Sequence, residues 1–162
     1  MTNTPSQATQ RISALTNHLT PSALPAKMST DAKPPITCHV LDTTLGRPGR
    51  SIPVTLTLHN PPSTLVPAGQ ALKYTATTNS DGRVTSWTAA SPFSSDSLDV
   101  VFKREGDQKY SLTFDTEAYF GERGIKTFFP EVEVKFLVRE KGEHYHVPVL
   151  LGPFGYTTYR GS

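Results

Sequence analysis

The chain has 162 residues, of which 36% are hydrophobic and 19% are charged, and its net charge is +2 at pH 7. This length suffices for one domain with a hydrophobic core, and so balanced a charge argues against a nucleic-acid partner, which needs a clustered basic surface. A single cysteine excludes a disulfide framework, and without a run of 18 apolar residues no membrane-spanning helix is predicted. We therefore expect a soluble, intracellular protein.

Residues 1–35 are rich in Thr, Ser, Pro and Ala, a composition that predicts a disordered N-terminal extension. Within it, residues 11–19 are similar to the N-terminal peroxisomal targeting nonapeptide, which has a basic residue, an aliphatic residue, five variable positions, His or Gln, and Leu or Ala. The residues that would share one face of a helix are Arg11, Ile12, Leu15, His18 and Leu19. This similarity predicts a peroxisomal import receptor as a partner and a peroxisomal location, with a cytoplasmic location as the alternative.

From residue 36 onward, short β-branched or aromatic segments alternate with turn-forming Gly, Pro, Asn and Asp, which predicts strands. Apolar and mostly polar residues alternate from 131 to 138, as is typical of half-buried antiparallel strands. One short helix is expected at 115–120, with Asp115 as its N-cap and Gly121 at its end. The expected strands are 36–42, 52–58, 71–77, 109–114, 132–138, 144–151 and 155–159. Together these elements predict an all-β sandwich.

Histidines occur at positions where the strand pattern turns them away from the core. If Cys38 and Val40 point inward, the period of two puts His39 on the outer face, and His144 and His146 likewise share one strand face. A single outward histidine on a strand is ordinarily just exposed to solvent. A second strand with outward histidines favours a functional site. Cys38 and His39 point to opposite faces, so we expect a core cysteine rather than a Cys–His nucleophile.

Other polar residues leave alternatives open. Arg83 and Arg160 are either surface cations or anchors for an anionic or carbonyl-rich ligand. A zinc site formed by His144, His146 and His39 is a rival hypothesis, but no acidic or cysteine ligand stands at a familiar spacing, so no metal is expected. Chain ends normally fray. The final Tyr-Arg-Gly-Ser, at 159–162, instead looks like part of a polar site.

These segments, in this order, closely resemble the transthyretin-related 5-hydroxyisourate hydrolases over residues 36–162. The resemblance is carried by Thr-Cys-His-Val-Leu-Asp-Thr with Gly-Arg-Pro, by Asn-Ser-Asp-Gly-Arg, by Phe-Phe-Pro-Glu-Val, by His-Tyr-His-Val-Pro and by the terminal Tyr-Arg-Gly-Ser. Cys38 is a departure, because the family usually has Thr or Ser at this position.

The resemblance implies a transthyretin-like β-sandwich of two four-stranded sheets with one short helix. It also implies a homotetramer, a dimer of dimers whose active sites lie in a channel between the dimers. The implied catalytic residues are His39, Arg83 and His146, and the implied substrate-binding residues are Tyr159, Arg160, Gly161 and Ser162.

The implied reaction, in urate degradation, is the hydrolysis of 5-hydroxyisourate to 2-oxo-4-hydroxy-4-carboxy-5-ureidoimidazoline without a cofactor. The alternative is a transthyretin-like carrier of small molecules without catalysis.

Overall fold

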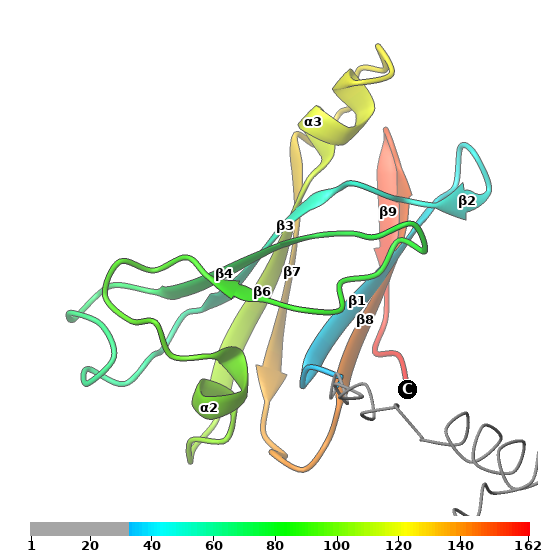
Figure 1. The fold of residues 1–162 in the computed structure, drawn as a ribbon. Helices are drawn as coiled ribbons and strands as arrows, with labels where there is room; N and C mark the ends of the chain where they lie inside the picture. Colours follow the sequence, from blue (N-terminus) through cyan, green and yellow to red (C-terminus); the bar gives the residue numbers. More distant parts are fainter. Residues whose placement is uncertain (1–32) are drawn as a thin grey trace, which may run out of the picture. The chain divides into compact units, whose positions relative to one another are not determined.

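A computed structural model describes residues 33–162, and the nonapeptide predicted at 11–19 lies outside these residues. The described chain forms two sheets and two short helices (Figure 1). The first, here the β1 sheet, has the order β2 (Arg47–Pro48), β1 (Ile36–Asp42), β8 (Tyr145–Gly152), β9 (Gly155–Thr158). The second, here the β3 sheet, has the order β5 (Thr88–Ala89), β4 (Leu72–Thr77), β3 (Pro53–Leu58), β6 (Gln108–Asp115), β7 (Glu131–Val138).

The predicted β-sandwich is confirmed, and each of the seven expected strands begins and ends within one residue of its expected bounds. Within the described residues the sheets contain four and five strands rather than four each, because β5 pairs with β4 as a two-residue edge strand. A second helix, α2 (Leu98–Phe102), was not expected from the sequence. The Ser- and Asp-rich residues before α2 hid this five-residue helix, which buries Leu98, Val101 and Phe102.

The direction of one strand pair, which the sequence did not predict, matters for the site. β1 and β8 are parallel, with Thr37 opposite His146 and His39 opposite Pro148. A parallel pair needs a long crossover connection, and here the whole β3 sheet lies between the two strands in the sequence. The alternation of apolar and polar residues reports which face of a strand is buried and carries no information on direction.

The core lies between the two sheets and is built from alternate residues of each strand. On β1, Cys38 and Val40 are completely buried, and on β7 the inward Val132 and Val138 are buried as the alternation predicted. Burial of such side chains supplies the main driving force for folding. Large side chains with no exposed surface include Leu56, Tyr74, Tyr110, Leu112 and Phe114.

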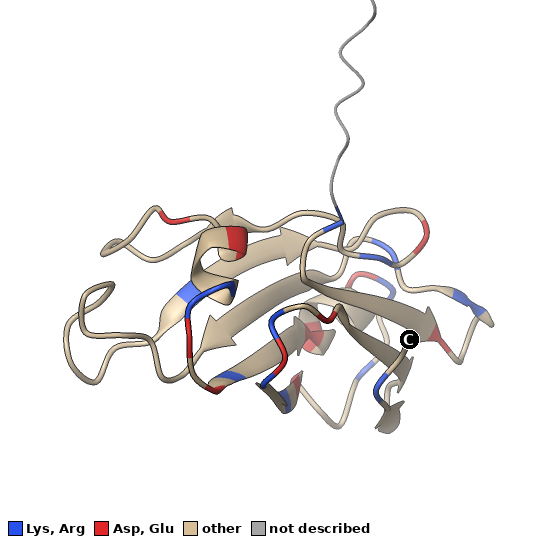
Figure 2. Ribbon diagram, turned by 90° about the horizontal axis from the view of Figure 1, so that it is seen from below, with Lys and Arg blue, Asp and Glu red and all other residues tan. Residues whose placement is uncertain are grey.

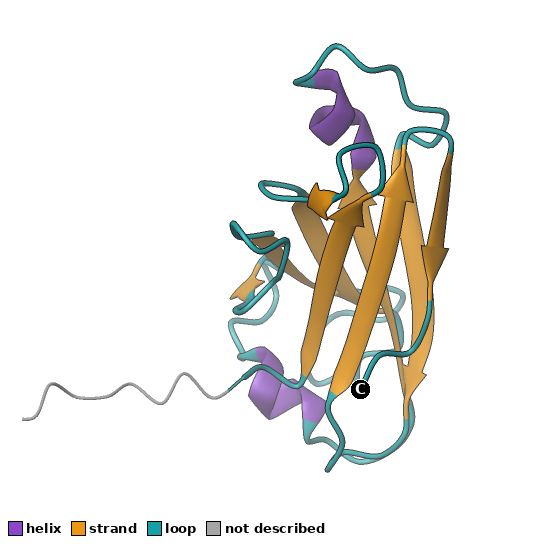
Figure 3. Cartoon of the chain, turned by 90° about the vertical axis from the view of Figure 1, so that its right-hand side faces the viewer, coloured by secondary structure: helices purple, strands orange, loops and turns teal. Residues whose placement is uncertain are grey.

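The helices α2 and α3 (Thr116–Gly121) lie at opposite ends of the sandwich (Figure 3). α3 is the predicted helix, and the carboxylate of its N-cap Asp115 accepts a hydrogen bond from the Ala118 N–H at 2.9 Å. No helix among the described residues is long and apolar enough to cross a membrane.

Basic and acidic residues are interspersed along the described chain (Figure 2). Several lie in ion pairs at the surface, such as Arg104 with Asp96 at 3.3 Å and Arg139 with Asp107 at 3.5 Å. Exposed pairs of this kind contribute little to stability.

Candidate active site

The parallel pairing of β1 and β8 places two of the predicted catalytic residues on one sheet face. Cys38 and Val40 point into the core, and His39 is half-buried on the opposite, outer face of the β1 sheet. Since Thr37 lies opposite His146 in the register, His146 occupies that same outer face one strand away. The outward orientation predicted for both histidines is therefore confirmed.

Arg83 reaches this face through a turn that packs against β1. The Val40 N–H donates a hydrogen bond to the Gly82 carbonyl at 2.8 Å, and His39 and Arg83 form an isolated antiparallel bridge. Gly82 has a φ of +71°, and a Cβ there would overlap the Val40 carbonyl oxygen, so this position requires glycine. The Asn79 side chain closes the turn by accepting a hydrogen bond from the Arg83 N–H at 2.9 Å.

The last residues of the chain cross over His146. The Gly161 N–H donates a hydrogen bond to the His146 carbonyl at 2.9 Å, which holds the two segments side by side. A Cβ on Gly161 would lie 2.6 Å from Cδ2 of the His146 ring and 2.9 Å from Cγ of Pro148. Only glycine therefore fits here, and Tyr159 and Ser162 flank it as exposed residues.

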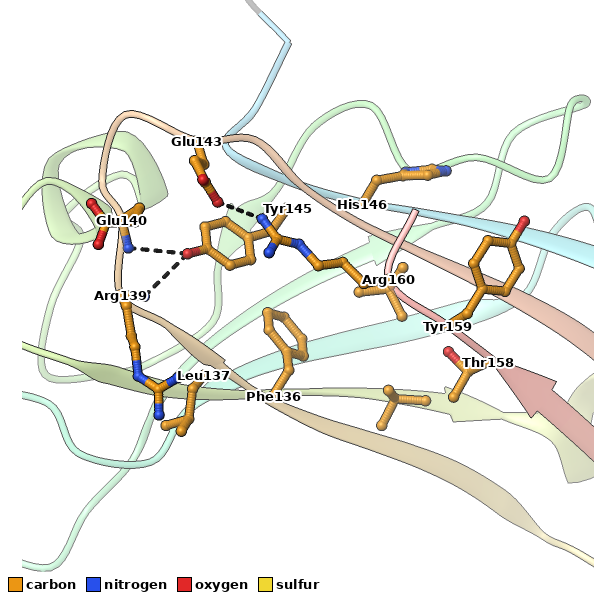
Figure 4. A pocket seen from close by; sticks show the side chains of 12 residues that line it. Phe136, Leu137, Arg139, Glu140, Glu143, Tyr145, His146, Thr158, Tyr159 and Arg160 are labelled. Carbon is orange, nitrogen blue, oxygen red and sulfur yellow. Dashed lines mark hydrogen bonds and ion pairs between the residues drawn. The ribbon is translucent and has the colours of Figure 1, made fainter. Parts of the chain in front are cut away.

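Arg160 points away from the histidines. Its guanidinium pairs with the Glu143 carboxylate and lies over the Tyr145 ring, 5.3 Å from the ring centroid. In Figure 4 the Arg160 side chain and the His146 ring extend in opposite directions. In a single chain, Arg160 thus fixes the terminal segment to β8, and its predicted contact with substrate remains a prediction. A cavity of about 350 Å³ beside it is lined by residues that include Phe136, Leu137, Glu143, His146, Tyr159 and Arg160.

The site is electrostatically arranged to keep its histidines neutral. Burial and, after it, the Arg83 cation lower the pKa of His39 below its ordinary value. Burial, Arg83 and Lys33, in this order of importance, lower the pKa of His146 to about 4. At neutral pH the face therefore presents two uncharged imidazoles beside the Arg83 guanidinium, with Lys33 as a second nearby cation. The imidazoles are thus unprotonated and able to accept a proton, and the Arg83 cation can stabilise negative charge that develops beside them.

Thr37 is a site residue that the sequence did not reveal. Its hydroxyl oxygen lies 2.8 Å from Nδ1 of His146 and 2.9 Å from Nε2 of His144. The alternation along β1 puts Thr37 on the same face as His39. This shared face is the one local feature of the sequence that indicates a site role for Thr37. Its partners follow from the β1–β8 register, which joins residues more than 100 positions apart.

Two alternative chemistries can be compared with the geometry. Cys38 is completely buried, and burial raises the pKa of its thiol to about 12, so it is the core residue that was expected and not a nucleophile. His144 and His146 stack with ring centroids 6.3 Å apart, and both direct a nitrogen to Thr37. Among residues 33–162, no three His, Cys, Asp or Glu side chains are grouped to hold a metal ion.

The sequence model of the HIUase/Transthyretin family matches residues 36–161. The chain belongs to this family. Within it, a probable 5-hydroxyisourate hydrolase of Schizosaccharomyces pombe is 40% identical over 129 residues, which are 80% of this chain and 92% of the yeast protein. The 5-hydroxyisourate hydrolase of Mus musculus is 38% identical over 136 residues, covering 83% of this chain and 100% of the mouse protein.

Solved structures of the HIUase/Transthyretin family have the same fold. The 5-hydroxyisourate hydrolase of Klebsiella pneumoniae superposes with a TM-score of 0.55 at 28% identity, covering 78% of this chain and 98% of the other. Sea bream transthyretin in complex with thyroxine superposes with a TM-score of 0.59 at 24% identity, covering 78% of this chain and 94% of the other. The transthyretin likeness concerns the fold alone.

Proposed function

We propose that this protein hydrolyses 5-hydroxyisourate to 2-oxo-4-hydroxy-4-carboxy-5-ureidoimidazoline, a step of urate degradation. The observation that carries the proposal is the convergence of His39, Arg83 and His146 on one sheet face, with Gly161 packed against the His146 ring. The relatives named 5-hydroxyisourate hydrolase support it, since they are similar over most of the chain.

The residues of this face supply what hydrolysis of a cyclic amide requires. A neutral imidazole takes a proton from water as the water oxygen bonds to the amide carbon, and the carbonyl electrons move onto its oxygen. Arg83 stabilises that oxyanion, because a fixed cation is most effective where charge develops. The C–N bond then breaks, and the imidazolium returns its proton to the leaving nitrogen. His39 and His146 share this work, and Tyr159 and Ser162 orient substrate or water through their hydroxyl groups.

The test is a urate oxidase-coupled assay in which 5-hydroxyisourate is generated in situ and its ultraviolet absorbance is followed. The intact protein should accelerate the decay well beyond that seen without protein, and a variant that lacks Ser162 should be sharply slower while still folded. No acceleration by the folded protein would contradict the proposal and favour the small-molecule carrier. The polarity of the site argues against the carrier hypothesis, because the site has imidazole, guanidinium and hydroxyl groups rather than an aliphatic surface.

We also propose that the active form is a homotetramer, a dimer of dimers with sites in the channel between the dimers. Leu150, on β8, is 38% exposed, and Tyr159, in the terminal segment just after β9, is 59% exposed. Assembly through the outer face of the β1 sheet would cover them and enclose the substrate. Sedimentation velocity should give the mass of four 17.7 kDa chains, and a monomer with full activity would contradict the proposal.

A peroxisomal location is proposed from residues 11–19, which resemble the targeting nonapeptide. A fluorescent protein fused to residues 1–30 should enter peroxisomes, and the same fusion with His18→Ala should stay in the cytosol. A diffuse cytosolic signal from the unaltered fusion would contradict targeting and favour a cytoplasmic location.

A further inference from the structure

One hydroxyl group joins two of the histidines on the outer face of the β1 sheet. Thr37 is 5% exposed, and its oxygen lies 2.9 Å from Nε2 of His144 and 2.8 Å from Nδ1 of His146. The hydroxyl has a single proton to share between two nitrogens, so at least one ring must donate to it. The arrangement therefore determines on which nitrogen each ring carries its proton.

The hydrogen bond made by the other nitrogen of the His144 ring determines which ring nitrogens carry protons. A backbone hydrogen bond to Pro34 raises the pKa of His144, against the larger lowering by burial, and because Nε2 lies 2.9 Å from the Thr37 oxygen, we assign the proton of that bond to Nδ1. Burial and Lys33 lower the pKa of His144, so its ring is neutral and Nε2 is bare. Nε2 then accepts the Thr37 proton, and the Thr37 oxygen accepts the proton on Nδ1 of His146. Nε2 of His146 remains bare.

We propose that Thr37, supported by His144, is a positioning residue that holds His146 as the tautomer protonated on Nδ1. This role rests on the proposed hydrolysis, in which the bare Nε2 takes the proton from water. The hydrogen bond made by one ring nitrogen decides the protonation of the other. Thr37 thus acts on the reaction through His146 without touching the substrate.

The surroundings of His146 explain why the tautomer matters. The charged and titratable groups that face it are Arg83, Lys33, His144 and His39, and each disfavours an added proton. The ring is therefore neutral at neutral pH. A neutral ring has only one basic nitrogen, and with the proton on Nε2 that nitrogen would be Nδ1, which faces Thr37 instead of the site.

The variants Thr37→Val and Thr37→Ser separate this role from a purely structural one. Valine keeps the β-branched shape but loses the hydroxyl, whereas serine keeps the hydroxyl. Thr57→Val is the matched control, because Thr57 is a buried strand threonine of the β3 sheet, 7% exposed. In the assay above, we expect kcat of Thr37→Val to fall at least about 10-fold with KM little changed, since a wrong histidine tautomer costs up to about 10⁴-fold. Thr37→Ser and Thr57→Val should stay near the wild type.

Long-range ¹H–¹⁵N NMR of the histidine rings in the full-length protein reads the tautomer directly and needs no substrate. The wild type and Thr37→Ser should show His146 protonated on Nδ1, and Thr37→Val should show a shift toward Nε2 protonation. A wild-type His146 protonated on Nε2 would overturn the proposal even if every variant failed to fold.

A folded Thr37→Val variant with the wild-type kcat would overturn the proposal as well. Failure of the proposed function looks different: the wild type itself would then leave the decay of 5-hydroxyisourate unchanged, while the NMR result would still report the tautomer.

Discussion

At the scale of single residues, the neutral state of His146 gives the site its expected pH dependence. The pKa of this histidine is lowered to about 4, chiefly by burial and then by Arg83. Protonation fills the basic nitrogen, so activity is lost as the pH falls through this pKa. We predict that kcat/KM shows no loss with a midpoint near 6.5, because the pKa of His39 is lowered as well, and that the loss due to His146 comes only toward pH 4.

The pH profile of kcat/KM, measured on protein whose fold is checked by circular dichroism at each pH, tests this prediction. A midpoint near 6.5, the ordinary pKa of histidine, would mean that the imidazole carrying the reaction is not held neutral by burial and Arg83.

Gly161 gives a second prediction at this scale. In Gly161→Ala, the new methyl group meets Cδ2 of the His146 ring at 2.6 Å and Pro148 at 2.9 Å, so the terminal segment must move. A misplacement of about 1 Å costs about 10²-fold in rate, and we expect a loss of that order in kcat/KM. Gly155→Ala is the control, because a Cβ at Gly155 meets nothing within 4 Å. Equal activity of the two variants would show that the position of the terminal segment does not matter.

At the scale of elements, a buried carboxylate ties the end of β1 to the segment after α3. Asp42 has no exposed surface, and its Oδ2 accepts hydrogen bonds from the Tyr119 hydroxyl at 2.8 Å and from Arg123 at 2.7 Å. Burial raises the pKa of Asp42, but hydrogen bonds from Thr44, Tyr119 and Arg123 outweigh burial, so the pKa lies below its ordinary value. The carboxylate therefore stabilises the fold at neutral pH.

We predict that Asp42→Asn lowers the free energy of unfolding by about 3 kcal/mol at pH 7, because one partner of a buried ion pair is lost. A group with a depressed folded pKa stabilises above its unfolded pKa, here 3.8, and loses this effect as the pH falls through the folded value. The difference from wild type should therefore shrink below about pH 4.

Urea unfolding at pH 7 and at lower pH measures this effect. Asp107→Asn is the control, since the Asp107–Arg139 pair is about two-thirds exposed and should change stability by less than about 0.5 kcal/mol. Equal effects of the two substitutions would show that the Asp42 cluster does not hold β1 and α3 together.

The sequence predicted the bounds of the strands better than it predicted which strands pair with one another. Strand bounds followed from local alternation, which also gave the outward direction of His39 and His146. The parallel pairing of β1 with β8 did not follow, because register is set by contacts between distant segments. Thr37 was missed for that reason. α2 was missed because five residues are too few to show helical periodicity.

At the scale of the whole molecule, the outer face of the β1 sheet accounts for the family motifs. The Asp-Gly-Arg turn needs Gly82 to pack against β1, and the terminal Tyr-Arg-Gly-Ser needs Gly161 to pass over His146. The contact of Arg160 with Glu143 could not be predicted from the sequence, since it depends on how the terminal segment crosses β8. In both motifs a glycine thus lets the backbone pack closely against a neighbouring segment, and this packing positions the adjacent side chains.

The measurement that tests the central claim most directly is kcat/KM for 5-hydroxyisourate with the wild type and with His146→Ala at neutral pH. We predict rapid decay with the wild type and a loss of about 10²–10⁴-fold in the variant, the range for a lost general base. A folded His146→Ala protein that is as active as the wild type would contradict the account.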